Sequence, residues 1–311
     1  MRRWLKPLSW LAGIAGLAVI IGYFGAGSIV DALRGVGLAT IALWVLLTLI
    51  ARVALAETTV APLQVLGFRM WRSDAFWVGW LRTFANQVFP AAGLVAYVHA
   101  IRRKVGISWS ELAALASPQF VLAAAALGVI GLAGALLNPQ LLGERLWLFL
   151  SVYGAVLLGA LLIARGAHWL TRLLPQALNE RVGATSRSLR DFARRPSLLL
   201  LIVACHAAVI LLRGLRLWLL FEAAGIDLAW NEALLVVVVA ESSMLIQLTP
   251  GGMGIREGAV LAGALLVGIP AEVAAGVAIV DRMLVIAITA LLTPPALLVL
   301  RSEAAADQRA K

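Results

Sequence analysis

Cysteine, charge and catalytic motifs are scarce in this chain of 311 residues. Its one cysteine, Cys205, allows no disulfide within the chain and no cysteine-based metal cluster. The histidines, His99, His168 and His206, share no ligand spacing, and the sequence contains neither a P-loop nor a GxSxG motif. We therefore expect no cofactor, no metal ion and no ATP-driven activity from this chain alone, and we expect that it is not an enzyme.

Charged residues make up only 14% of the chain, whereas hydrophobic residues make up 62%. Soluble domains carry about 25% charged residues. The hydrophobic residues form runs long enough to cross a bilayer, which takes about 20 apolar residues in a helix. This composition predicts an all-α polytopic membrane protein. The net charge of +10 does not indicate a nucleic-acid partner, because most basic residues lie in short loops, where they set the topology.

The runs predict about six full transmembrane helices and two interrupted segments in a single transmembrane domain, residues 1–311. The full helices are expected at about 9–30, 38–56, 109–137, 146–165, 197–220 and 271–300. We interpret the first of them as an uncleaved helix and not as a signal peptide. The basic segment 166–196 is typical of an interfacial helix or a solvated loop, and residues 301–311 are expected to form a cytoplasmic tail.

The interrupted segments, 75–99 and 232–268, contain proline and glycine where hydropathy predicts lipid. Non-helical backbone at membrane depth is tolerated only where protein or a water-filled cavity surrounds it, so we predict two re-entrant hairpins. The protein is expected in the cell (inner) membrane, and its basic loops place both termini on the cytoplasmic side. The chain would then consist of two halves, about 1–140 and 141–300, arranged as an inverted repeat. Matching broken segments in such a repeat indicate the binding site of a transporter.

The second break, IQLTPGGMGIREG (246–258), combines a helix stop with a helix start. Pro250 removes a backbone donor, and Gly251, Gly252 and Gly254 permit turns with positive φ. The free N–H groups of a helix that starts near Gly254 would attract an anion. Arg256 and Glu257 follow in its first turn, where the arginine supplies a forked donor for phosphate or carboxylate.

Other charged residues lie inside predicted membrane segments, where each would cost at least about 2.5 kcal/mol if it faced lipid. They are expected to line an interior polar cavity or to pair as structural contacts between helices. We favour function for Glu241, Arg256, Glu257, Asp281 and Arg282, and structural pairing for Arg52 and Glu57, which lie near a membrane end. The candidate substrate-binding set is completed by Gln247, Asn86, Pro90, Gly93, Arg82, Arg213 and Arg216.

TPGGMGIREG (249–258) and the later VGIPAEVAAGVAIVDRML (267–284) resemble the second signature of the lysylphosphatidylglycerol synthase transmembrane-domain family, also called flippase-like. The first signature of that family is matched by Asn86, Pro90 and Gly93. It departs from the pattern at Ala91 and around 94–97, where an acid and an arginine are expected. Either Arg82 or IRRK (101–104) substitutes for them, or the substrate differs from that of family members with both signatures. We expect a stand-alone member without a synthase domain, since 301–311 is a short tail after the last expected span.

The resemblance implies a membrane translocase for a lipid or lipid-linked anionic molecule, with membrane lipids and lipid-biosynthesis enzymes as partners. Two alternatives remain open. One is an integral-membrane enzyme in lipid, isoprenoid or hopanoid, or glycolipid biosynthesis, which would need a nucleophile or a metal site in the cavity. The other is an accessory scaffold for such an enzyme, in which changes in the cavity would be harmless.

Overall fold

The computed structural model describes residues 36–89, 92–165, 195–243 and 249–309, and every regular element within them is helical. Five helical segments are long and apolar enough to cross a membrane. The chain is therefore a multi-pass helical membrane protein. These segments are Leu38–Val65, Pro118–Leu137, Pro139–Ala164, Pro196–Ala223 and Ala271–Leu300.

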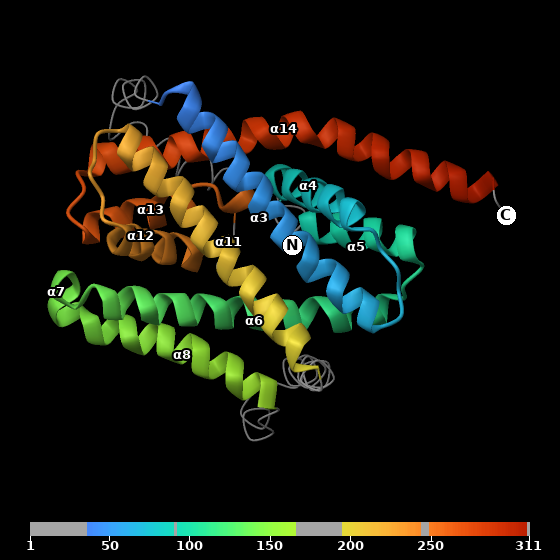
Figure 1. The fold of residues 1–311 in the computed structure, drawn as a ribbon, viewed down its shortest axis with the longest axis horizontal. Helices are drawn as coiled ribbons and strands as arrows, with labels where there is room; N and C mark the ends of the chain where they lie inside the picture. The colour runs from blue at the N-terminus through green and yellow to red at the C-terminus, as the bar shows by residue number, and fades with distance from the viewer. Residues whose placement is uncertain (1–35, 90–91, 166–194, 244–248, 310–311) are drawn as a thin grey trace, which may run out of the picture.

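The long helices pack in two groups around a shared core (Figure 1). Helix α3 (Leu38–Val65) lies against α11 (Pro196–Ala223), and α6 (Trp109–Leu137) lies against α8 (Leu146–Arg165). The second contact needs glycine on α6, because a Cβ at Gly131 would lie 2.3 Å from the ring of Tyr153. Small residues let membrane helices approach closely.

The two interrupted segments each form a pair of short helices. The first consists of α4 (Arg72–Val88, 17 residues) and α5 (Ala92–Val105, 14 residues), which pack against each other. The second consists of α12 (Trp230–Ser242, 13 residues), the short turn η3 (Pro250–Gly252) and α13 (Ile255–Leu266, 12 residues). Even α4 rises only about 26 Å at 1.5 Å per residue, which is shorter than a hydrocarbon core of about 30 Å.

Helix α12 is the most deeply buried element. All six residues from Ala233 to Val238 are buried, although the helix is short. Its close neighbour α13 approaches through Gly263, where a Cβ would lie 2.9 Å from the backbone of Val236. The last helix, α14 (Ala271–Arg309), passes alongside α13 and α4 and brings both interrupted segments to one place (Figure 1).

The predicted end of one span is wrong. The second span continues past residue 56 to Val65 and includes Pro62. The last span ends at Leu300 as predicted. Its helix continues into the expected tail, 301–311, as far as Arg309, because alanine, glutamate and glutamine after residue 301 favour a helix and no proline or glycine stops it. The predicted first span, 9–30, and nearly all of the interfacial segment, 166–196, lie outside the described residues.

Candidate functional site

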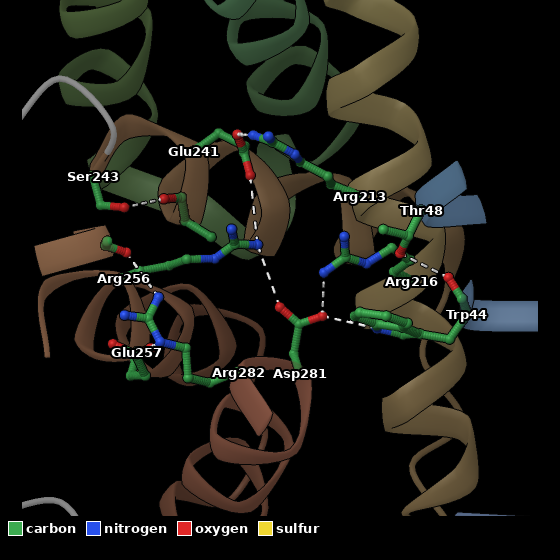
Figure 2. Close-up of polar contacts among 12 residues, drawn as sticks. Trp44, Thr48, Arg213, Arg216, Glu241, Ser243, Arg256, Glu257, Asp281 and Arg282 are labelled. Carbon is green, nitrogen blue, oxygen red and sulfur yellow. Dashed lines mark hydrogen bonds and ion pairs between the residues drawn. The ribbon is translucent and has the colours of Figure 1, made fainter. Parts of the chain in front are cut away.

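Seven charged side chains meet where the second interrupted segment packs against α11 and α14. We call this group the central ion cluster, and Figure 2 shows most of its contacts. Its arginines outnumber its carboxylates by one. The arginines are Arg213 and Arg216 of α11, Arg256 of α13 and Arg282 of α14, and the carboxylates are Glu241 of α12, Glu257 of α13 and Asp281 of α14.

Asp281 is the most heavily used carboxylate of the cluster. Its Oδ1 accepts from Arg216 at 2.6 Å and from the indole N–H of Trp44 at 2.9 Å. The guanidinium of Arg216 also stacks over the ring of Trp44, 4.1 Å from its centroid. All three side chains are buried, so the contact ties α3, α11 and α14 together without solvent. Short, charge-assisted contacts of this kind are the strong ones.

Arg256 lies between two carboxylates and is held loosely by both. Its Nη2 is 3.4 Å from Asp281 Oδ2 and 3.7 Å from Glu241 Oε1. Both distances exceed the 2.7–2.9 Å that is usual for a charge-assisted hydrogen bond. Glu241 forms its closer ion pair with Arg213. The charges therefore alternate from α11 through α12 and α13 to α14, with Arg256 in the middle.

The glycine-rich turn is fixed to the cluster through Arg282. Gly251, Gly252 and Gly254 all have positive φ, as their sequence predicts. Arg282 donates to the carbonyl oxygen of Gly251 at 2.7 Å and lies 3.5 Å from Glu257. The other oxygen of Glu257 accepts from the N–H of Gly254 at 2.7 Å.

That last contact changes the predicted anion site at the start of α13. Glu257 reaches back to the residue before the helix and binds the N–H at Gly254, as in a capping box. The protein's own carboxylate therefore occupies a donor that the sequence assigned to a ligand. Arg256, one residue earlier, points to the opposite acids and not to this helix end.

The two breaks meet in space. A Cβ at Gly251 would lie 3.3 Å from Cγ of Gln87, and η3 packs on α4. On the first segment, the amide oxygen of Asn86 accepts from the N–H of Gly93 at 2.8 Å. Asn86 thus binds the N-terminal end of α5 much as Glu257 binds that of α13. A Cβ at Gly93 would lie 2.3 Å from the same oxygen, which requires glycine there.

A cleft opens beside the cluster. Its volume is about 20 Å³, which is room for a water molecule and not for a lipid headgroup. In this structure the cleft therefore does not admit a lipid headgroup. The cleft is lined by Arg256, Glu257, Val260, Ala278, Asp281, Arg282 and Val285.

The other residues that the sequence analysis singled out are placed as follows. Among the described residues Arg82 forms no ion pair with the cluster, and it stacks over Tyr97, 5.0 Å from the ring centroid. Pro90 and Gln247 lie outside the described residues, and Pro250 is placed by its backbone in η3. Glu57 forms its ion pair with the exposed Arg72 and not with Arg52.

Sequence reasoning missed Trp44 as part of the site. It lies within a transmembrane helix, whereas tryptophan in membrane proteins is enriched at the interfaces. A tryptophan within a span and not at its end was the feature of the sequence that could have indicated a polar partner for Trp44. A buried indole N–H needs an acceptor, and Asp281 supplies one.

Comparison with protein families gives one match. The family described as "Lysylphosphatidylglycerol synthase TM region" matches residues 10–292, which is most of the chain. No curated protein and no solved structure matches the chain.

Proposed function

The chain belongs to the lysylphosphatidylglycerol synthase TM region family, and from this premise we propose that it is a translocase for a lipid or lipid-linked molecule with an anionic headgroup. The observation that carries the proposal is the central ion cluster. Four arginines and three carboxylates are withdrawn from lipid between helices that also hold the glycine-rich turn. Ionisable groups inside membrane segments are expensive and mark substrate paths.

Arg256 is the residue best suited to exchange an internal partner for a substrate. Arg216 is held by Asp281 at 2.6 Å and by the ring of Trp44, whereas Arg256 touches its two acids only at 3.4 and 3.7 Å. A headgroup phosphate could offer Arg256 two parallel hydrogen bonds at shorter distance. Asp281 would keep Arg216, so the helices would stay joined while Arg256 turns to the ligand.

The cleft is too small for a lipid headgroup, so it would have to open during transport. We propose that α4/α5 and α12/α13 are the two re-entrant hairpins of an inverted repeat, whose tips meet at Gly251 and Gln87. Movement of one hairpin against the other would open the cleft to one leaflet at a time. Arg282 would follow the tip, since it binds the carbonyl oxygen of Gly251.

We propose further that the protein lies in the cell (inner) membrane and that both chain termini are on the cytoplasmic side. The support is the distribution of arginine and lysine in the sequence, by the positive-inside rule. In this orientation α4/α5 enters from the cytoplasmic side and α12/α13 from the opposite side.

The test is transbilayer movement in liposomes that contain the purified protein. Fluorescently labelled lipids with anionic and zwitterionic headgroups are placed in both leaflets, and the outer label is quenched by a reagent that does not cross the bilayer. We expect anionic lipids to reach the outer leaflet faster than in protein-free liposomes, and faster than zwitterionic ones. Background rates for every lipid of a broad panel would contradict the proposal.

A further inference from the structure

A second group of basic residues lies between α3 and α4, beside the central ion cluster, and Arg213 and Arg216 of that cluster are close enough to repel the charge of Arg52. Arg52 of α3 donates to the carbonyl oxygen of Gly79 at 3.0 Å and to the hydroxyl of Thr83 at 2.8 Å. Its guanidinium also stacks over Trp80, 4.6 Å from the ring centroid. All of these partners are neutral. Within the part of the chain that the structure describes, Arg52 forms no ion pair.

Arg82 is the neighbouring cation, and its side chain is exposed. It lies ten residues after Arg72, where α4 begins, which is about 15 Å along the helix. Its guanidinium stacks over the ring of Tyr97, whose hydroxyl is 2.9 Å from that of Thr59. Among the described residues no carboxylate forms an ion pair with Arg82.

Donors without acceptors gather at the same place. The Nε–H of Arg52 and the indole N–H of Trp80 are buried and bind no acceptor among the described residues. Arg82 is close enough to repel the charge of Arg52 and any charge on His206, whose Nε2 is also buried without a partner. Buried donors normally have acceptors, and each exception calls for an explanation.

The contrast with the central ion cluster is one of charge balance. There, four arginines face three carboxylates and the surplus is one charge. Here, two arginines face none among the described residues, and Arg52 lies within a helix that can cross a membrane, where an uncompensated charge is costly. An anion that reaches this second group would therefore meet positive charge that no carboxylate of the described residues pairs with.

We propose that Arg52, Trp80, Arg82 and Tyr97 form a binding site for the phosphate of an anionic phospholipid, which we call the α3/α4 basic site. The exposed Arg82 makes the first contact with the phosphate, and Arg52 and the Trp80 indole supply further donors once α3 and α4 separate slightly. The acyl chains stay in lipid. This inference rests on the proposed function in taking a lipid as the ligand, and it gives that lipid a site before it reaches Arg256.

The test is equilibrium binding and involves no transport. Purified protein in a neutral detergent is titrated with phosphatidylglycerol, with phosphatidylcholine or with inorganic phosphate, and the shift in Tm is followed. Wild type is compared with Arg82→Gln, Arg82→Lys and Arg52→Gln. Arg69→Gln is the matched control, because Arg69 is exposed in the loop before α4 and its loss changes the net charge equally.

We expect phosphatidylglycerol to raise Tm at lower concentration than phosphatidylcholine. Arg82→Gln and Arg52→Gln should each weaken apparent phosphatidylglycerol affinity by about tenfold, which corresponds to one charged hydrogen bond. Arg82→Lys should retain most of the affinity, and Arg69→Gln all of it. Because Arg82 is exposed, its substitution keeps the test valid even if Arg52→Gln fails to fold.

Two results would overturn the inference. One is phosphatidylglycerol binding by Arg82→Gln that equals binding by Arg69→Gln. The other is an equal Tm shift with inorganic phosphate, which would assign the site to the free ion. Transport decides the proposed function separately. Lost binding in Arg82→Gln together with a wild type that moves no lipid would leave the site standing and the translocase wrong.

Discussion

Replacing Asp281 by asparagine would leave Arg216 buried without a carboxylate. Arg216 is 4% exposed, and its one ion pair among the described residues is the 2.6 Å contact with Asp281. Arg256 would lose its contact with Asp281 but keep its contact with Glu241, so it would be less affected than Arg216. Removing one partner of a buried ion pair destabilises a protein by about 3–5 kcal/mol. The asparagine oxygen can still accept from Trp44, so we expect about 3 kcal/mol for Asp281→Asn.

Denaturant unfolding in mixed micelles, followed by tryptophan fluorescence, measures this change. Asp227→Asn is the control, because Asp227 is exposed in the loop before α12 and should stay within about 0.5 kcal/mol of wild type. The double variant Asp281→Asn with Arg216→Met removes the stranded charge. It should therefore be less destabilised than the sum of the two single variants, by about 1–2 kcal/mol. A free energy of unfolding for Asp281→Asn that equals that of Asp227→Asn would refute the reasoning.

Two further predictions concern helix ends. Gly93→Ala should destabilise the protein by about 2 kcal/mol or more, since its Cβ would lie 2.3 Å from the amide oxygen of Asn86; wild-type unfolding in the same micelles would contradict this. Hydrogen bonds from Ser108 lower the pKa of Glu111 at the start of α6. Its stabilisation is thus present above the ordinary pKa and lost as pH falls through the lowered one, so Glu111→Gln should lower Tm at neutral pH and match wild type in acid. A Tm difference that persists unchanged in acid would show that the cap does not titrate in this way.

The sequence predicts the helical membrane class because long apolar runs leave few other structures possible. It also predicts the second turn, because glycines that follow a proline favour a turn with positive φ. Gly251, Gly252 and Gly254 all have positive φ in the structure. Five of the six expected full spans coincide with helices that can cross a membrane, and the sixth lies outside the described residues.

Pairing within the site was beyond sequence reasoning. Nothing in the chain indicates that Arg216 would bind Asp281, 65 residues away, while Arg256 stays loosely held. These choices depend on how α11 and α14 are rotated against each other, and that rotation is set by tertiary packing. The same reason explains why Arg52, expected to pair structurally, bonds only neutral groups.

Capping chemistry also altered one expectation. The start of α13 has the free donors and positive dipole that attract an anion. Glu257, at the third helical position, competes with an anion for these donors, and its side chain accepts the hydrogen bond from the N–H of Gly254. The sequence contains both signals, and only the structure shows which one prevails.

We propose that Arg256 binds the anionic headgroup while it passes through the site. The most direct measurement is the rate at which a labelled anionic phospholipid crosses liposomes containing wild type, Arg256→Gln or Arg69→Gln. The account predicts that Arg256→Gln is about tenfold slower than wild type, as expected for one lost charged contact, while Arg69→Gln matches wild type. Equal rates for all three proteins, or rates no faster than in protein-free liposomes, would contradict it.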